Sequence, residues 1–223
     1  MMRGLRLVVA ETAKDKVAQA LAVGALLIGT AALAAPVTQK VSLTSAPLSQ
    51  SESDMAVSSA QETLELVWQG VDVDGDGSAD FANPTGQAPR GHDAYGDGEF
   101  GARRDGGSRR HEGVDFMAEA GQEVAAPMSG YVTKIGYAYA GDSNLKFVEI
   151  TNPALRFEAR VFYVNPSVEV GDAVRLGEPL GEMHSLQRKY PGGMTDHVHL
   201  EIVDRRGRHL NALTMIQARY VAG

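Results

Sequence analysis

The sequence predicts a mostly β protein built from short antiparallel strands, with an N-terminal export or anchor helix. Glycine is abundant, with 25 residues in a chain of 223, which is typical of a protein with many tight turns. Short runs of β-branched and aromatic residues lie between these glycines from about residue 96 onwards, as expected for strands that end in turns. Beyond the N-terminal segment, a helical pattern is credible only over about residues 211–218.

Composition excludes several functional classes. The chain has 28 acidic and 21 basic residues, a net charge of −7, and no dense basic stripe. Nucleic-acid binding is therefore not expected, because it depends on clustered Lys and Arg. Cysteine is absent, which excludes disulfide scaffolds, cysteine nucleophiles and thiolate metal sites. Any metal must therefore be held by histidine and carboxylate side chains.

Residues 1–34 predict export from the cytoplasm. A run of 19 residues, 17–35, contains only two polar members and follows a segment with several basic side chains. Ala32 and Ala34 fit the small-residue positions of a signal-peptidase site, with cleavage before Ala35. The run is also long enough to act as an uncleaved membrane anchor. Both interpretations predict a periplasmic or extracellular protein, either released or tethered to the inner membrane.

Two further segments precede the main domain. Residues 35–62 are rich in Ser, Thr, Gln and Ala without a sustained apolar period, which predicts a linker. Residues 63–95 begin with an apolar alternation and continue into an acidic loop. We therefore predict a separate acidic arm over 63–95, followed by the main β domain over 96–217.

The acidic loop resembles the start of a calcium-binding loop. Its carboxylates fall at the first, third, fifth and ninth positions of that pattern, which are Asp72, Asp74, Asp76 and Asp80. Closely spaced carboxylates repel one another unless a cation neutralises them. Asn83 occupies the position of the usual bidentate Glu, so a complete EF-hand is not expected. The loop is either a looser Ca²⁺ site or a solvated acidic turn.

Two histidine clusters predict a metal site. One spans His111 to Asp115, and the other is His197-Val-His199. Residues two apart on a strand share a face, so His197 and His199 are expected to point into one cleft. Glu201 shares that face, either to orient one of these histidines or as an exposed carboxylate. Imidazole and carboxylate groups are suitable zinc ligands, and three of them leave a coordination position for water. The remaining histidines are assigned to the surface: His92, His184 and His209.

These clusters resemble the motifs of the lysostaphin-type (M23) zinc peptidases. The stretch from His111 to Asp115 resembles the HxxxD motif of that family, and His197-Val-His199 resembles its HxH motif. Residues 121–132 are similar to the core strand pair of the family, and residues 170–181 to its later turn. The motifs occur in the family order, which makes the resemblance specific.

The resemblance implies a fold, a cofactor and an activity. The fold is an antiparallel β-sheet groove, and the cofactor is Zn²⁺ held by His111, Asp115 and His199. It also implies that His197 lies unligated beside the metal, as the catalytic general base or as a donor to the developing oxyanion. The implied protein is an exported zinc endopeptidase that cleaves peptide cross-links of bacterial peptidoglycan.

One departure from the family pattern opens an alternative. The family has a further catalytic His in a Tyr-x-His-Leu segment, and in residues 162–166 Asn165 stands at the expected position. Asn cannot exchange protons near neutral pH. Residues 186–192 resemble the leukocyte cell-derived chemotaxin branch more closely, which keeps the zinc ligands but is regarded as non-enzymatic. The alternative is a catalytically silent zinc module that binds wall peptides or regulates another hydrolase. A third possibility is an extracellular calcium-dependent adhesion or structural protein in which the histidine pairs are incidental.

The expected substrate contacts surround the metal site. Wall peptides carry free carboxylates, which a basic rim would attract, although the same residues would also suit a solubilising loop. A tyrosine hydroxyl near the site could donate to the oxyanion or simply pack in the core. The residues predicted to contact substrate are Arg109, Arg110, Asn165 and Tyr190.

Overall fold

The computed structural model describes residues 38–41 and 64–222. The predicted export segment (1–34) and most of the predicted linker (35–62) lie outside the described residues. Within the described ranges, no helix has both the length and the apolar character needed to cross a membrane.

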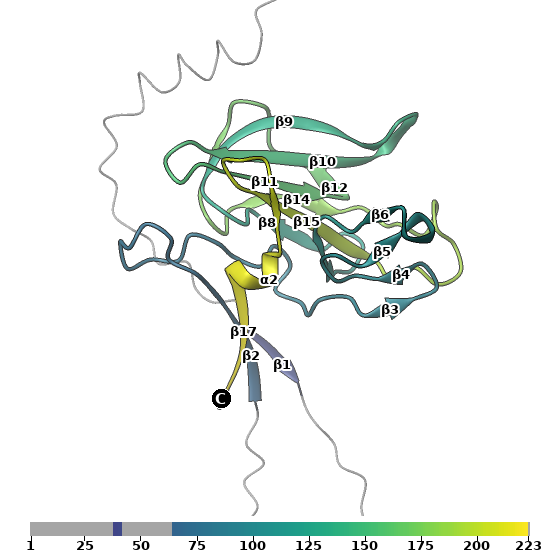
Figure 1. The fold of residues 1–223 in the computed structure, drawn as a ribbon, viewed down its shortest axis with the longest axis horizontal. Coiled ribbons are helices and arrows are strands. Elements are labelled where there is room, and N and C mark those ends of the chain that lie inside the picture. Colours follow the sequence, from purple (N-terminus) through teal and green to yellow (C-terminus); the bar gives the residue numbers. More distant parts are fainter. Residues whose placement is uncertain (1–37, 42–63, 223) are drawn as a thin grey trace, which may run out of the picture.

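A seven-stranded antiparallel sheet forms the body of the molecule (Figure 1). Its main path runs β13-β9-β10-β11-β15-β16, and β7 pairs with β15. Both β7 and β16 lie along the edge of β15 that faces away from β11. The strands span β7 (Val114–Met117), β9 (Gly130–Tyr139), β10 (Asp142–Asn152), β11 (Phe157–Phe162), β13 (Ala173–Val174), β15 (His197–Val203) and β16 (His209–Leu210).

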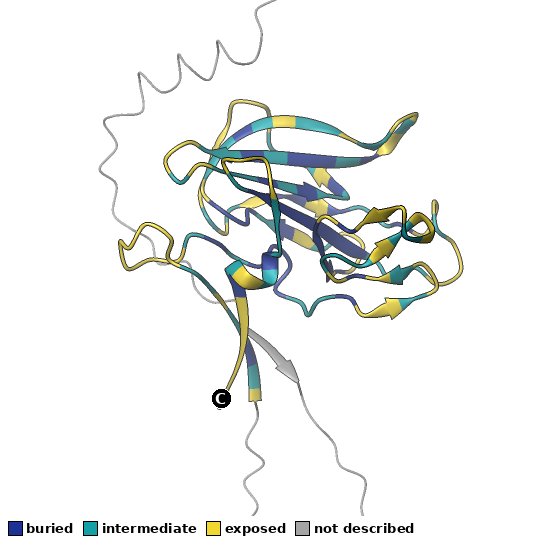
Figure 2. Cartoon of the chain, viewed as in Figure 1, coloured by how far each residue is buried: buried dark blue, intermediate teal, exposed yellow. Residues whose placement is uncertain are grey.

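Strand β15 is buried along its whole length (Figure 2). Because side chains alternate between the two faces of a sheet, the residues Val198, Leu200 and Ile202 point to one face. The motif residues His197 and His199 point to the other. This alternation separates the hydrophobic core from the polar site on a single strand.

Two small hairpins lie beside β15, at one end of the body (Figure 1). Each hairpin is short, and the second contains a single turn of 3-10 helix, η2. Their strands are β3 (His92–Asp93), β4 (Gly96–Asp97), β5 (Arg103–Arg104) and β6 (Arg109–Arg110), and η2 spans Asp105–Gly107.

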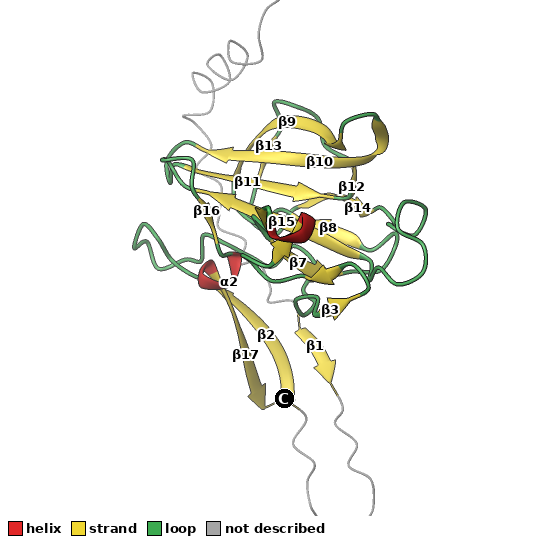
Figure 3. Ribbon diagram, turned by 45° about the vertical axis from the view of Figure 1, so that its right-hand side comes forward, coloured by secondary structure: helices red, strands yellow, loops and turns green. Residues whose placement is uncertain are grey.

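A third sheet joins the two ends of the described chain. Strand β2 (Leu64–Gly70) lies between β1 (Thr38–Val41) and β17 (Ile216–Ala222), and the three extend away from the body (Figure 3). Strand β1 lies inside the predicted linker, so part of that segment pairs in a sheet.

The helix predicted over 211–218 is shorter in the structure. Helix α2 spans only Ala212–Met215, and the residues that follow it form strand β17 because they pair with β2.

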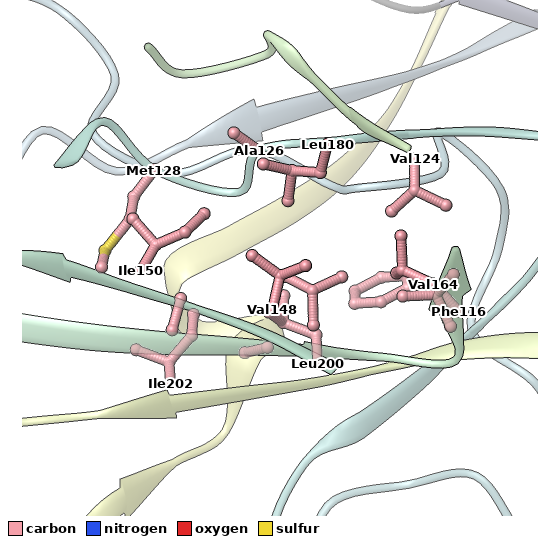
Figure 4. Packing of buried hydrophobic residues seen from close by; sticks show 14 of the residues in the cluster. Phe116, Val124, Ala126, Met128, Val148, Ile150, Val164, Leu180, Leu200 and Ile202 are labelled. Atoms are coloured by element: carbon pink, nitrogen blue, oxygen red, sulfur yellow. The ribbon is translucent and has the colours of Figure 1, made fainter. Parts of the chain in front are cut away.

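The hydrophobic core lies between the main sheet and a second, three-stranded sheet (Figure 4). The second sheet has the order β12-β14-β8, with β8 (Glu123–Ala125), β12 (Val164–Pro166) and β14 (Pro179–Met183). Its Val124 and Leu180 face Val148 and Leu200 of the main sheet, and all four are completely buried. The main sheet is thus packed on one face, and its other face is available for the site.

The boundary predicted at residue 95 does not separate two units. Phe81 lies in the predicted arm but is 1% exposed and belongs to the core of the main domain. Pro89 forms a β-bridge with Phe116, and the ring of Trp68 packs edge-on against Phe116 at 5.7 Å between centroids. The segment 64–95 is therefore part of the same packed body, because its apolar side chains complete the core.

Candidate metal centre

The pairing of β7 with β15 brings the two sequence motifs together. Asp115 and His199 are direct partners in this register, and His199 Nδ1 lies 2.8 Å from Asp115 Oδ1. His111, just before β7, places its Nε2 3.1 Å from the same oxygen and 2.8 Å from His199 Nδ1. All three side chains are buried. The three residues predicted as ligands therefore meet at one point.

The hydrogen bonds of these histidines orient their rings so that the three residues can bind a cation. His111 Nδ1 lies 2.7 Å from the backbone oxygen of Glu99, which can only accept, so Nδ1 carries the proton. His199 Nε2 lies 3.3 Å from Glu201 Oε1 and donates to it in the same way. Each ring therefore turns its other nitrogen toward Asp115 Oδ1. These three atoms can be held this close together either by protons between them or by a shared metal ion.

The charges of the site support this conclusion. Burial by itself raises the pKa of Asp115, but hydrogen bonds from His111 and His199 hold it well below its ordinary value. Burial also acts against a charged His199, yet the hydrogen bonds and charges of Asp115 and Glu201 raise its pKa to about 9. The pocket is therefore built to stabilise positive charge, and a divalent cation would compete with the proton of His199.

His197 lies beside this group without joining it. Its Nδ1 is 2.6 Å from the backbone oxygen of Thr195, so Nε2 carries the lone pair and lies 3.6 Å from Asp115 Oδ1. Burial lowers the pKa of His197 and outweighs the opposing effect of Asp115. A neutral imidazole with a free nitrogen that faces the cavity is suited to accept a proton.

Arg90 completes the site and was not predicted from the sequence. Its Nη2 lies 2.7 Å from Asp115 Oδ2, and its Nη1 lies 2.6 Å from a carboxylate oxygen of Asp93. The guanidinium is 3% exposed. By holding Oδ2, Arg90 directs Oδ1 of the same carboxylate toward the histidines. No motif spacing signals this role, because Arg90 lies far outside the HxxxD segment.

Tyr163, rather than Asn165, faces the site. The Tyr163 ring meets the His197 ring edge-on at 5.4 Å between centroids, and its hydroxyl lies 2.8 Å from that of Tyr139. Asn165 is exposed, and its Oδ1 contacts His184 at 2.9 Å. The prediction of Asn165 as a site residue is therefore wrong. Strand β11 ends at Phe162, the backbone turns at Tyr163 with φ 68°, and β12 carries Asn165 away to pair with β14.

A cavity of about 570 Å³ opens above the centre and is rimmed by arginine and tyrosine side chains. Arg109 and Tyr190 line it as predicted. Arg109 forms an ion pair with Asp105 at 3.1 Å, and Tyr190 packs edge-on against Tyr95 at 5.3 Å between centroids. Arg110 is not among the lining residues; its Nη1 donates to the backbone oxygen of Gly101 at 3.3 Å. Several further residues that line the cavity were not predicted from the sequence, namely Tyr95, Tyr139, Phe162 and Met194.

The acidic loop lies apart from this centre. Three of its four predicted ligands have carboxylate oxygens that lie within 4.8 Å of one another. These residues are Asp72, Asp74 and Asp80. Asp76 is outside that group and accepts the N–H of Ser78 at 2.7 Å. Backbone N–H groups of the loop also bond to Asp72 and lower its pKa. Asn83 is buried and accepts the N–H groups of Thr85 and Gly86, so it faces its own turn. Calcium binding remains a prediction.

Comparison with known sequences gives one family and several relatives. The family model described as peptidase family M23 matches residues 109–212. Myeloid protein 1 of Gallus gallus is 34% identical over 125 residues, which cover 55% of this chain and 37% of that protein. Leukocyte cell-derived chemotaxin-2 of Mus musculus is 32% identical over 117 residues, which cover 50% of this chain and 71% of that protein. The chain thus matches well under half of the chicken protein and about two thirds of the mouse protein.

Solved structures with a similar backbone include two peptidases. The antimicrobial peptidase lysostaphin from Staphylococcus simulans aligns with a TM-score of 0.41 and 20% identity, over 52% of this chain and 46% of that chain. A zinc-containing peptidase from Vibrio cholerae aligns with a TM-score of 0.43 and 20% identity, over 68% of this chain and 46% of that chain.

Proposed function

This chain belongs to peptidase family M23, and on that premise we propose that it is an exported zinc-dependent endopeptidase of bacterial peptidoglycan. Its reaction is hydrolysis of an amide bond in the peptide cross-links of the wall. The observation that carries the proposal is the meeting of His111 Nε2, Asp115 Oδ1 and His199 Nδ1 at the floor of the cavity. No such arrangement is needed to stabilise a β-sheet core.

His111, Asp115 and His199 would hold Zn²⁺, because two imidazoles and a carboxylate are a ligand set that zinc accepts. When bound, zinc supplies Lewis acidity toward an amide carbonyl and a water molecule. The neutral His197, with its free Nε2, accepts a proton from the attacking water and returns it to the leaving amine. Glu99 and Glu201 fix the ring orientations of the two metal-binding histidines through their hydrogen bonds.

The residues at the cavity rim are suited to bind a peptide substrate with free carboxylates. Arg104 and Arg109 line the cavity, and their guanidinium groups can form paired hydrogen bonds with carboxylates. The rings of Tyr139 and Tyr190 lie at 6.3 Å between centroids and provide flat apolar surface for the peptide backbone. The proposal includes export to the cell wall, because the peptide cross-links that would be the substrate lie outside the cytoplasm.

The proposal is tested with purified sacculi and the purified protein. We expect added zinc to support a loss of turbidity, and mass spectrometry of the released fragments to identify the bond that is cut. The His111→Ala variant should bind less zinc and leave the sacculi intact. Clearing that persists in this variant would exclude the zinc mechanism.

A second candidate function is a catalytically silent zinc module that binds wall peptides or regulates another hydrolase. It is favoured by Tyr163, which occupies the space beside His197. Burial raises the pKa of the Tyr163 hydroxyl above its ordinary value, so this group stays protonated and cannot accept a proton near neutral pH. Zinc-dependent binding to sacculi without any released fragment would support this function over hydrolysis.

A further inference from the structure

A second group of ligand atoms lies next to the candidate metal centre. One ligand atom from each of Glu112, Glu201 and His209 falls within 4.8 Å of the other two. We propose that these three residues bind a second divalent transition-metal ion, separate from the one held by His111, Asp115 and His199. From the sequence alone, His209 is predicted to be a surface residue.

The strand pairing brings these residues together. His209 on β16 is the partner of Val203 on β15. Glu112 lies two residues before the start of β7, which pairs along the same edge of β15. Gly113 allows the close approach of this segment, because a Cβ atom there would lie 2.4 Å from the backbone oxygen of Leu200. Glu112 and His209 therefore flank Glu201 from one side of the strand.

The ring nitrogen of His209 indicates a missing ligand. His209 Nε2 is buried and has no hydrogen-bond partner among the described residues, although it lies 3.4 Å from Glu201 Oε2. Buried polar atoms are normally paired. Around a tetrahedral zinc ion with bonds of about 2.0–2.2 Å, two ligand atoms lie about 3.4 Å apart. The separation of these two atoms therefore fits a shared ion better than a hydrogen bond.

The surrounding charges also favour a divalent cation. Glu112 and Glu201 belong to the group itself, and Glu149 and Glu158 lie close by. Arg160 contacts Glu149 at 3.1 Å and Glu201 at 3.4 Å, and it also pairs with Glu158. One guanidinium thus faces three carboxylates, and Glu112 adds a fourth acidic group, so a bound divalent ion would offset the remaining negative charge.

One carboxylate connects the two proposed centres. Glu201 directs Oε1 toward His199, a ligand of the first centre, and Oε2 toward His209. Oε2 also accepts from Arg160 Nη1 at 3.4 Å. Glu112 and His209 are not members of the first ligand group. Substitution of either residue should therefore remove the second ion and leave the first ion in place.

Zinc stoichiometry and affinity of the full chain test the proposal. The Asp74→Asn background is used throughout, because it removes one of the three clustered carboxylates of the acidic loop and so weakens that competing site. We expect this protein to bind two ions and the His209→Ala and Glu112→Gln variants to bind one. Loss of an outer-shell partner already weakens metal binding about 10–100-fold, so loss of a direct ligand should cost at least that much. The His184→Ala variant, which removes an exposed histidine elsewhere, should still bind two.

Two measurements make the result independent of catalysis and of folding. Co²⁺ titration followed by visible absorption should show two successive spectral components, and His111→Ala should remove only one of them. Circular dichroism checks the fold of each variant, and the exposed position of Glu112 makes Glu112→Gln the safer substitution. Binding of a single ion in the Asp74→Asn background, or two ions retained in both His209→Ala and Glu112→Gln, would overturn the proposal.

Discussion

Asp115 and His199 lie directly opposite each other on β7 and β15, with 2.8 Å between Asp115 Oδ1 and His199 Nδ1. These two residues are 84 positions apart in the chain and belong to different motifs. A shift of one residue in the pairing would send one of the two side chains into the core face, because strand side chains alternate. The metal centre therefore depends on strand register, and Val198 and Leu200 fix that register by burial in the core.

Arg90→Met should weaken metal binding and destabilise the fold. Without the guanidinium, Asp115 loses the partner of Oδ2 and its carboxylate is no longer oriented. We expect zinc affinity to fall about 10–100-fold and the free energy of unfolding to fall by about 3–5 kcal/mol, the usual cost of breaking a buried ion pair. Competition with a chromogenic chelator and urea unfolding measure the two effects. Arg110→Met, at an exposed arginine, should change neither quantity.

Gly113→Ala should damage the site through backbone crowding. Its Cβ would lie 2.4 Å from the backbone oxygen of Leu200 and 2.6 Å from His199 Cε1. We expect the free energy of unfolding to fall by about 1–3 kcal/mol, as for other overpacked positions, together with weaker zinc binding. Gly91→Ala is the matched control, because an added Cβ there meets nothing within 4 Å. Equal stability of the two variants would contradict this account.

An ion pair between Asp142 and Lys189 beside the cavity predicts that the stability of the protein depends on pH. The N–H of Asn144 and the ammonium of Lys189 lower the pKa of Asp142 from 3.8 to about 2. Since the folded-state pKa is depressed, this contact stabilises the protein above about pH 4 and is lost as the pH falls through 2. Lys189 also lies 4.4 Å from the centroid of the Tyr139 ring, so the contact holds the loop that carries Tyr190.

The Asp142→Asn variant isolates this contribution. Its melting temperature should be lower than that of the wild type at pH 7, and the gap should close between pH 4 and pH 2. Lys189→Met should show the same pattern, because it removes the other partner. A gap that stays constant down to pH 2 would show that Asp142 acts through something other than its charge.

The sequence predicted those parts of the site that depend on local periodicity. His197 and His199 were predicted to lie on one face of a strand because they are two residues apart, and in the structure both lie on β15. The position of Arg90 could not be predicted, because its contact with Asp115 arises from the path of a loop. The separate arm over 63–95 was also wrong, since burial of Phe81 in the main core is a tertiary effect that composition does not reveal.

The position of Asn165 could not be predicted for a related reason. Residues 162–166 were matched to the Tyr-x-His-Leu segment of the family, which put Asn165 at the position of the histidine. In the structure β11 ends at Phe162, and the chain turns through a positive φ at Tyr163. A single residue in the left-handed region changes which side chain faces His197, and nothing in the spacing of the motif signals that turn.

This difference yields a paired prediction for catalysis. If Tyr163 occupies the position of the missing proton-transfer group, Tyr163→His should raise the rate of cross-link cleavage by about 10²–10⁴-fold, the usual contribution of a general acid or base. Asn165→His places the same imidazole on the exposed face of β12 and should leave the rate unchanged. Fragment release from sacculi at matched zinc occupancy compares the two variants. A gain in Asn165→His but not in Tyr163→His would mean that the loop after β11 rearranges when the substrate binds.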